Sequence, residues 1–166
     1  MNNSQWHIER KNEASPQAIS GADRLPHASM AVMSKVHIER VLLVDDDAAI
    51  RRIAEITLSR VGKWQVSLAE SGAQALDLVS NESPDLILLD VMMPGMDGPT
   101  TLKLLREKES LSQTPIIFMT AKVQKHEIDS YRLLGAAGVI SKPFDPMELP
   151  SEIRSILAQM TGACVG

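Results

Sequence analysis

The sequence is poor in the features that mark secreted, membrane and nucleic-acid-binding proteins. Its single cysteine, Cys164, has no partner, which excludes a disulfide framework and favours a reducing compartment. No apolar run reaches the length of a membrane span, and the N-terminus lacks the layout of a secretory signal. The net charge of −4 leaves no broad basic field for nucleic acid. We therefore expect a soluble, cytoplasmic protein with no membrane insertion and no direct nucleic-acid contact.

The length and the composition predict one domain with additional terminal segments. The chain has 166 residues, of which 44 % are apolar, enough for a substantial core. Residues 1–36 show no steady period and predict a flexible N-terminal tail or arm, and residues 161–166 predict a C-terminal tail. The string His-Ile-Glu-Arg occurs at 7–10 and again at 37–40. Chance explains this repeat most simply; the alternative is that the first copy pairs with a neighbouring sheet.

Strands and helices alternate between residues 37 and 160. Unbroken runs of Val, Ile and Leu indicate strands buried on both faces, as in a parallel sheet. Gly62 and Gly135 are expected to stop helices, and Ser71 to cap one. The alternation predicts an α/β fold, a doubly wound five-stranded parallel sheet with helices on both faces. The expected strands are 40–44, 65–69, 86–89, 115–119 and 139–141, and the expected helices are 48–61, 71–80, 99–107, 125–134 and one that ends near 160.

The start of the last helix has two alternatives. Residues 145–148, Asp-Pro-Met-Glu, have the pattern of a capping box with proline at the first helical position. Pro150 would then lie in the second turn, where it lacks a donor and clashes with the preceding turn. The helix therefore either starts bent near Pro146 or begins near Leu149.

Acidic residues end two of the apolar strands. Asp45, Asp46 and Asp47 follow the first strand, and Asp90 follows the strand at 86–89. Because ligands of parallel sheets bind at the carboxyl ends of the strands, these carboxylates should lie at one rim. There they repel one another unless a cation joins them. Oxygen ligands without nearby Cys or His favour Mg²⁺, Mn²⁺ or Ca²⁺ over zinc, while Asp47 is expected to cap the following helix.

Polar residues also end the last two strands. Thr120 follows the strand at 115–119, and Lys142 follows the strand at 139–141. Singly, Thr120 would be an ordinary strand-end residue and Lys142 a solvated lysine. In their order and spacing with the aspartates, however, they make residues 37–160 resemble the receiver domain of two-component response regulators. The resemblance implies the flavodoxin-like strand order 2-1-3-4-5 and a cis peptide bond before Pro143.

The resemblance also implies a role for each of these residues. Asp90 would be the phosphorylated nucleophile, and Thr120 and Lys142 would contact the oxygens of the phosphoryl group. Mg²⁺ or Mn²⁺ would be held by Asp45, Asp46, Asp90 and the backbone carbonyl of Met92. The protein would then be a signalling receiver rather than an enzyme, apart from its own phosphorylation and slow dephosphorylation.

The partners follow from the same resemblance. A histidine kinase or a histidine phosphotransfer protein would supply the phosphoryl group, and a downstream output protein would respond to it. A homodimer through the face made by the helix at 125–134, the strand at 139–141 and the last helix is a further candidate. We expect a stand-alone receiver, with a fragment of a longer protein as the alternative.

One position differs from what is usual in that family, and two others bear on the lifetime of the phosphorylated state. Val139 lies where receivers usually carry Tyr or Phe, and the one tyrosine, Tyr131, belongs to the preceding helix. An aromatic switch coupled to Thr120 is therefore not expected, and the alternative is that the face made by the helix at 125–134, the strand at 139–141 and the last helix responds through Thr120 and the following loop alone. In the family, the side chains two residues after the phosphorylated aspartate and two after the threonine flank the hydrolytic water. Here they are Met92 and Lys122, which predicts slow self-dephosphorylation.

Two other functions compete with this interpretation. Haloacid-dehalogenase-type phosphatases also use an aspartate at a strand end with Mg²⁺, but their motif Asp45-x-Asp47-x-Thr would require threonine where Ala49 lies. Turnover of a phosphomonoester would distinguish such an enzyme from a receiver that is labelled once. A binding module that no longer uses phosphate is the second alternative, and the intact polar set argues against it.

Overall fold

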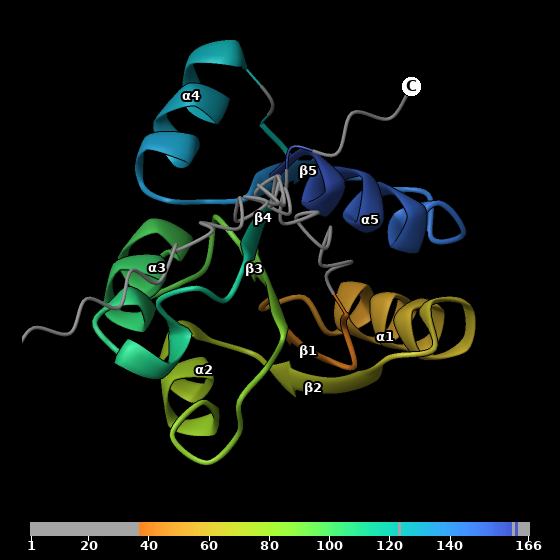
Figure 1. The fold of residues 1–166 in the computed structure, drawn as a ribbon, viewed down its shortest axis with the longest axis horizontal. Helices are drawn as coiled ribbons and strands as arrows, with labels where there is room; N and C mark the ends of the chain where they lie inside the picture. Colours follow the sequence, from red (N-terminus) through yellow and green to blue (C-terminus); the bar gives the residue numbers. More distant parts are fainter. Residues whose placement is uncertain (1–36, 123, 161, 163–166) are drawn as a thin grey trace, which may run out of the picture. The chain divides into compact units, whose positions relative to one another are not determined.

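A five-stranded parallel sheet forms the centre of the protein (Figure 1). The computed structural model describes residues 37–122, 124–160 and 162, all within one unit of the chain, Met33–Gly166. The strand order is β2-β1-β3-β4-β5 and all neighbouring strands are parallel, as predicted. The strands are β1 (Arg40–Val44), β2 (Gln65–Ala69), β3 (Leu86–Asp90), β4 (Ile116–Thr120) and β5 (Gly138–Ser141).

Helices cover both faces of the sheet, and each face has its own apolar cluster (Figure 1). One cluster packs α1 and α5 against the sheet, and the other packs α2 and α3, with α4 at its margin. Every residue of β3 and β4 is buried, which explains their continuous apolar sequences. The helices are α1 (Ala48–Thr57), α2 (Gly72–Leu78), α3 (Gly98–Arg106), α4 (Lys125–Leu133) and α5 (Leu149–Met160).

The register of the central strands decides which strand ends meet. Val44 of β1 pairs with Leu89 of β3, so the residues that follow them, Asp45 and Asp90, leave the sheet side by side. Thr120 of β4 pairs with Ser141 of β5, which places Lys142 at the same edge. The polar residues predicted from the sequence therefore share the carboxyl edge of the sheet.

The first helix differs from its prediction as one α-helix over 48–61. Its α-helical part ends at Thr57, and a wider π-helical turn spans Leu58–Gly62. The Trp64 ring packs so closely on Gly62 that a Cβ atom there would lie 2.9 Å from the ring. The Trp64 amide donates to the Leu58 carbonyl at 3.1 Å. The turn thus widens where the chain accommodates a large buried ring, a tertiary contact that helix periodicity does not reveal.

The other element bounds shift by one or two residues. The last helix begins at Leu149, so Pro150 lies in its first turn, where no backbone donor is needed. This settles the two alternatives for its start. The peptide bond between Lys142 and Pro143 is cis, as the resemblance implied. The N-terminal tail, the first His-Ile-Glu-Arg copy and nearly all of 161–166 lie outside the described residues.

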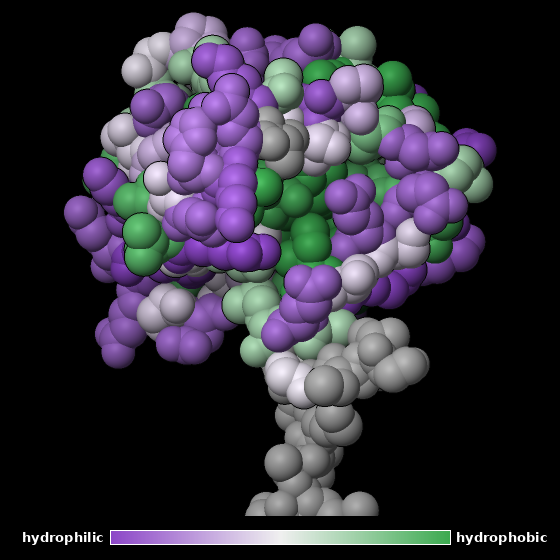
Figure 2. All heavy atoms as spheres, turned by 90° about the horizontal axis from the view of Figure 1, so that it is seen from above, coloured by the Kyte–Doolittle hydropathy of each residue, from purple (hydrophilic) through white to green (hydrophobic). Residues whose placement is uncertain are grey.

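The surface seen from above Figure 1, the side of α4 and α5, is largely hydrophilic (Figure 2). In its middle, apolar side chains line a hollow between hydrophilic borders. Leu133, at the end of α4, has 90 % of its surface exposed. No helix of the described residues is long and apolar enough to cross a membrane.

Gly98 provides a test of how tightly the loop after β3 packs. A Cβ atom there would lie 2.4 Å from the backbone oxygen of Asp90, which cannot move without disturbing the end of β3. We expect Gly98→Ala to lower the free energy of unfolding by about 1–3 kcal/mol, as overpacking does. Lys103→Ala, an exposed change in the same helix, should stay within about 0.5 kcal/mol of wild type. Equal denaturation midpoints for the two variants would contradict this packing.

Candidate functional site

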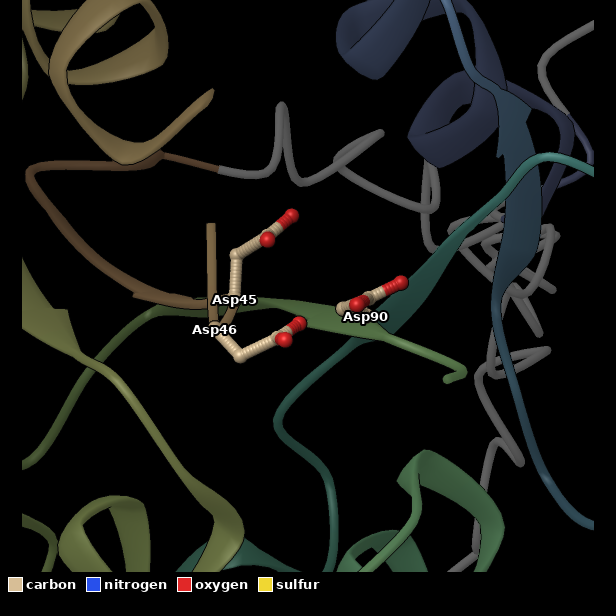
Figure 3. Close-up of side chains that lie close together, drawn as sticks. All are labelled: Asp45, Asp46 and Asp90. Carbon is tan, nitrogen blue, oxygen red and sulfur yellow. The ribbon is translucent and has the colours of Figure 1, made fainter. Parts of the chain in front are cut away.

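Three carboxylates from two adjacent strands meet at the carboxyl edge of the sheet (Figure 3). Asp45 and Asp46 follow β1, and Asp90 is the last residue of β3. One carboxylate oxygen from each lies within 4.8 Å of the other two. Asp45 and Asp90 are buried, whereas Asp46 is exposed. This arrangement concentrates negative charge at a site that the solvent reaches from one side.

The backbone around Asp45 fixes its carboxylate. The Asp47 amide donates to Asp45 Oδ1 at 2.9 Å, and the Arg51 guanidinium donates to the Asp45 carbonyl at 2.6 Å. Asp47 itself accepts from the amides of Ala49 and Ile50, so it caps α1 as predicted. Three consecutive aspartates therefore take different positions: one is buried, one faces the cluster from solvent and one caps a helix.

Lys142 supplies a positive charge between two of the carboxylates. Its ammonium group lies 2.5 Å from Asp45 Oδ2 and 3.0 Å from Asp90 Oδ1. Its side chain is 12 % exposed and reaches this position from the end of β5, across the end of β4. The sequence predicted Lys142 at this edge, but its bridge between Asp45 and Asp90 was not foreseen.

Burial and charge act in opposite directions on the pKa values of this pair. Burial raises the pKa of Asp90, and the nearby Asp45 carboxylate adds to this, while the bond from Lys142 only partly compensates. Burial by itself would lower the pKa of Lys142, but hydrogen bonds and attraction from Asp45 and Asp90 raise it. Lys142 therefore keeps its charge, and the Asp90 carboxylate is poised where additional positive charge would stabilise it.

Thr120 lies at the end of β4 on the same edge. Its side chain is buried, and its hydroxyl accepts the Lys122 amide at 3.1 Å while its carbonyl accepts the Lys142 amide at 2.8 Å. The accepted bond leaves the hydroxyl proton able to donate to a bound group. Through these two hydrogen bonds, Thr120 connects the segments that follow β4 and β5 to the candidate site.

Two other predicted positions lie at the solvent side of the site. The Met92 side chain is 60 % exposed, and its amide approaches Asp90 Oδ1 at 3.4 Å. Lys122 is also exposed. Sequence reasoning missed Arg51, whose place one helical turn after the acidic run was the signal that could have suggested a contact with that run.

The donor set fits a hard divalent cation. One carboxylate oxygen each from Asp45, Asp46 and Asp90 lies within 4.8 Å of the others, close enough to bind one cation. No Cys or His of the described residues joins them. The exposed Asp46 leaves the cluster open to solvent, which suits an ion that keeps some of its waters. The geometry can therefore bind Mg²⁺ or Mn²⁺ beside the Asp90 carboxylate.

The stability of the metal-free protein tests the role of Lys142. Lys142→Met leaves two buried carboxylates without their cation, so we expect a loss of about 3–5 kcal/mol in chelator-treated protein at neutral pH. Asp46→Ala removes one repelling charge and should be no less stable than wild type. Urea denaturation measures both, with Lys122→Met as the control for an exposed lysine. Similar midpoints for Lys142→Met and Lys122→Met would contradict the charge balance described above.

Comparison with known proteins agrees with this geometry. Residues 41–154 match the family described as response regulator receiver domain. The chain is 41 % identical over 125 residues to the probable transcriptional regulator ycf27 of Porphyridium aerugineum, covering 75 % of this chain and 50 % of that protein. It is 42 % identical over 120 residues to the transcriptional regulatory protein CpxR of Escherichia coli, covering 72 % and 50 %. The chain thus spans about half the length of these curated relatives.

Solved structures of receiver proteins have the same fold as this chain. The chemotaxis protein CheY4 of Vibrio cholerae superposes with a TM-score of 0.68 at 31 % identity, over 72 % of this chain and 99 % of that one. The shared fold, the polar strand ends and the family match over most of the chain agree with one another. The chain therefore belongs to the response regulator receiver domain family.

Proposed function

We propose that Asp90 is the phosphoacceptor of this receiver and that its phosphorylation depends on Mg²⁺ or Mn²⁺. The observation that carries this proposal is the position of the Asp90 carboxylate, beside two further carboxylates and 3.0 Å from the Lys142 ammonium. A carboxylate oxygen of Asp90 would attack phosphorus, the bond from phosphorus to the donor would break, and an acyl phosphate would form. The donor keeps the electron pair of the broken bond.

The surrounding residues have separate roles in this proposal. Asp45, Asp46, Asp90 and the Met92 carbonyl would hold the cation, which neutralises charge on the phosphoryl oxygens. Lys142 would contact one of these oxygens as a compact positive charge, and the Thr120 hydroxyl would donate to another. Phosphoryl transfer requires mainly positioning and charge neutralisation, and these groups supply both.

The proposed partners are those of a two-component pathway. A histidine kinase or a histidine phosphotransfer protein in the cytoplasm would donate the phosphoryl group, and an output protein would bind the changed surface. We propose residues 37–160 as the receiver and the flanking residues as tails. Whether it acts alone stays a prediction, because the curated relatives are about twice as long as the matched region.

The face formed by α4, β5 and α5 is the proposed interaction surface. Figure 2 looks onto it and shows apolar side chains in a hollow with hydrophilic borders. Leu133, the last residue of α4, is almost fully exposed and adds one more apolar side chain to the surface. These features support binding of an output protein or of a second copy of this receiver.

Phosphorylation by a small donor tests the acceptor. Incubation with acetyl phosphate and Mg²⁺ should add one phosphoryl group, detected by intact mass, and Asp90→Asn should abolish the addition. Asp47→Asn is the matched control, because Asp47 caps α1 and keeps a capping side chain after the change. Asp46→Ala should need more Mg²⁺ for the same labelling.

Two results would overturn these assignments. Full labelling of Asp90→Asn would exclude Asp90 as the acceptor, and an unchanged Mg²⁺ requirement in Asp46→Ala would exclude Asp46 as a ligand. Steady turnover of a phosphomonoester would favour the phosphatase alternative instead.

The lifetime of the phosphorylated state is a second test. Met92 and Lys122 are both exposed near the acceptor, and neither side chain can act as a base toward water while Lys122 is charged. We expect hydrolysis after donor removal to be slower in wild type than in the double variant Met92→Asn, Lys122→Glu, whose side chains can orient water. Decay of the phosphorylated mass over time measures this. Equal decay in both proteins would show that these side chains do not control access of water.

A further inference from the structure

The Asp46 carboxylate is the member of the acidic cluster that its own contacts hold least. Asp45 accepts the Asp47 amide at 2.9 Å and pairs with Lys142, which also lies 3.0 Å from Asp90. Among the described residues, no hydrogen bond or ion pair reaches the Asp46 carboxylate. It nevertheless points toward Asp90 (Figure 3) and lies within 4.8 Å of it. The backbone on either side of Asp46 must therefore set this direction.

Arg51 holds that backbone on both sides of Asp46. Its guanidinium donates to the Asp45 carbonyl at 2.6 Å, and its amide donates to the Asp47 carbonyl at 3.0 Å. The second bond is the ordinary first bond of α1, which most residues at this position could make. The first requires a long side chain with a donor at its end. A single side chain thus fixes the carbonyl that directly precedes Asp46.

The surroundings of Arg51 make this contact rigid. Its side chain is only 16 % exposed, and the Asp45 amide donates to the Ala69 carbonyl of β2 at 3.1 Å. Both backbone polar groups of Asp45 are therefore bonded, one to β2 and one to α1. The guanidinium also lies 3.9 Å from the Glu70 carboxylate, but that carboxylate is 71 % exposed, so the pair adds little stability. The bond to the Asp45 carbonyl is the main contact.

Arg51 and Lys142 act on the cluster in different ways. Lys142 contacts carboxylate oxygens of Asp45 and Asp90, so a bound cation would compete with its charge. Arg51 contacts a backbone carbonyl and leaves every carboxylate oxygen of the cluster free of its donors. An exposed carboxylate loses conformational freedom when it binds an ion. A segment fixed in advance makes that loss smaller, as outer partners of metal ligands do.

We propose that Arg51 is a positioning residue for the divalent-cation site. Its bond to the Asp45 carbonyl keeps Asp46 directed toward Asp90 before a cation binds. The guanidinium is positive and also repels a cation, so positioning and repulsion have opposite effects on affinity. Positioning should prevail, because the bond is direct while the Glu70 carboxylate partly offsets the charge. This inference rests on the cation site of the proposed function.

The sign of the effect provides the test. Free Mn²⁺, measured by electron paramagnetic resonance during titration of the unphosphorylated protein, gives the dissociation constant without relying on phosphorylation. Arg51→Met keeps an apolar stem but removes the donor, and it should raise the dissociation constant about tenfold, as loss of an outer partner does. Arg52→Met is the matched control: it removes the same charge one residue later, from a side chain that is 70 % exposed and pairs with Glu55. It should bind Mn²⁺ as tightly as wild type or slightly more tightly.

A conservative variant guards against a simple loss of folding, which urea denaturation monitors. Arg51→Lys keeps the charge and one donor group, so its affinity for Mn²⁺ should lie between those of wild type and Arg51→Met. If Arg51→Met does not fold, Arg51→Lys decides the question, and an affinity equal to that of wild type would overturn the inference.

The Mg²⁺ dependence of labelling by acetyl phosphate separates positioning from a general structural role. In Arg51→Met, half-maximal labelling should need about tenfold more Mg²⁺, while the rate at saturating Mg²⁺ stays close to wild type. A lower maximal rate with an unchanged Mg²⁺ requirement would overturn the inference, as would Mn²⁺ binding by Arg51→Met at least as tight as that of wild type. The proposed function would stand in either case. A wild type that binds no Mn²⁺ would overturn both.

Discussion

Negative charge concentrated at the carboxyl edge of a parallel sheet is the constraint on which this structure depends. The register of β1 against β3 places Asp45 beside Asp90, and both carboxylates are buried. Such charges are tolerated only when cations or hydrogen bonds replace the water they have lost. Lys142 and the Asp47 amide supply part of that replacement. The strand order matters because it brings the end of β5 close enough for Lys142 to reach both carboxylates.

The aspartates of the cluster have different roles, one in the structure and one in binding from the solvent side. Asp45 is bridged by Lys142 and fixed through its backbone by Arg51, so it acts as the rigid part of the cluster. Asp46 is exposed, and no ion pair of the described residues includes it. One carboxylate is therefore available from the solvent side, where an incoming cation with its waters would arrive.

The two faces of the sheet differ in how firmly their helices are held. On one face, Arg154 of α5 lies over the Trp64 ring at 4.9 Å and donates to the Gly62 carbonyl, which joins α5 to the π-helical turn after α1. On the other face, α4 contributes no buried residue. Thr120 and Phe118 lie on that second face of β4. The α-helix with the fewest buried residues thus lies next to the strand end that adjoins the acidic cluster.

The sequence by itself determined the fold class, the strand order through its resemblance, and the residues gathered at one edge. Continuous apolar runs that end in Asp90 or Thr120 carry this information locally, because parallel strands bring their carboxyl ends together. Only the tertiary structure decided the bridge from Lys142 to Asp45 and Asp90, the π-helical turn beside Trp64 and the contact between Tyr131 and Phe118. Each of these depends on side chains from distant segments meeting at a particular distance. Local periodicity and residue spacing do not encode contacts between distant segments. These contacts are decided only when the chain packs into its tertiary structure.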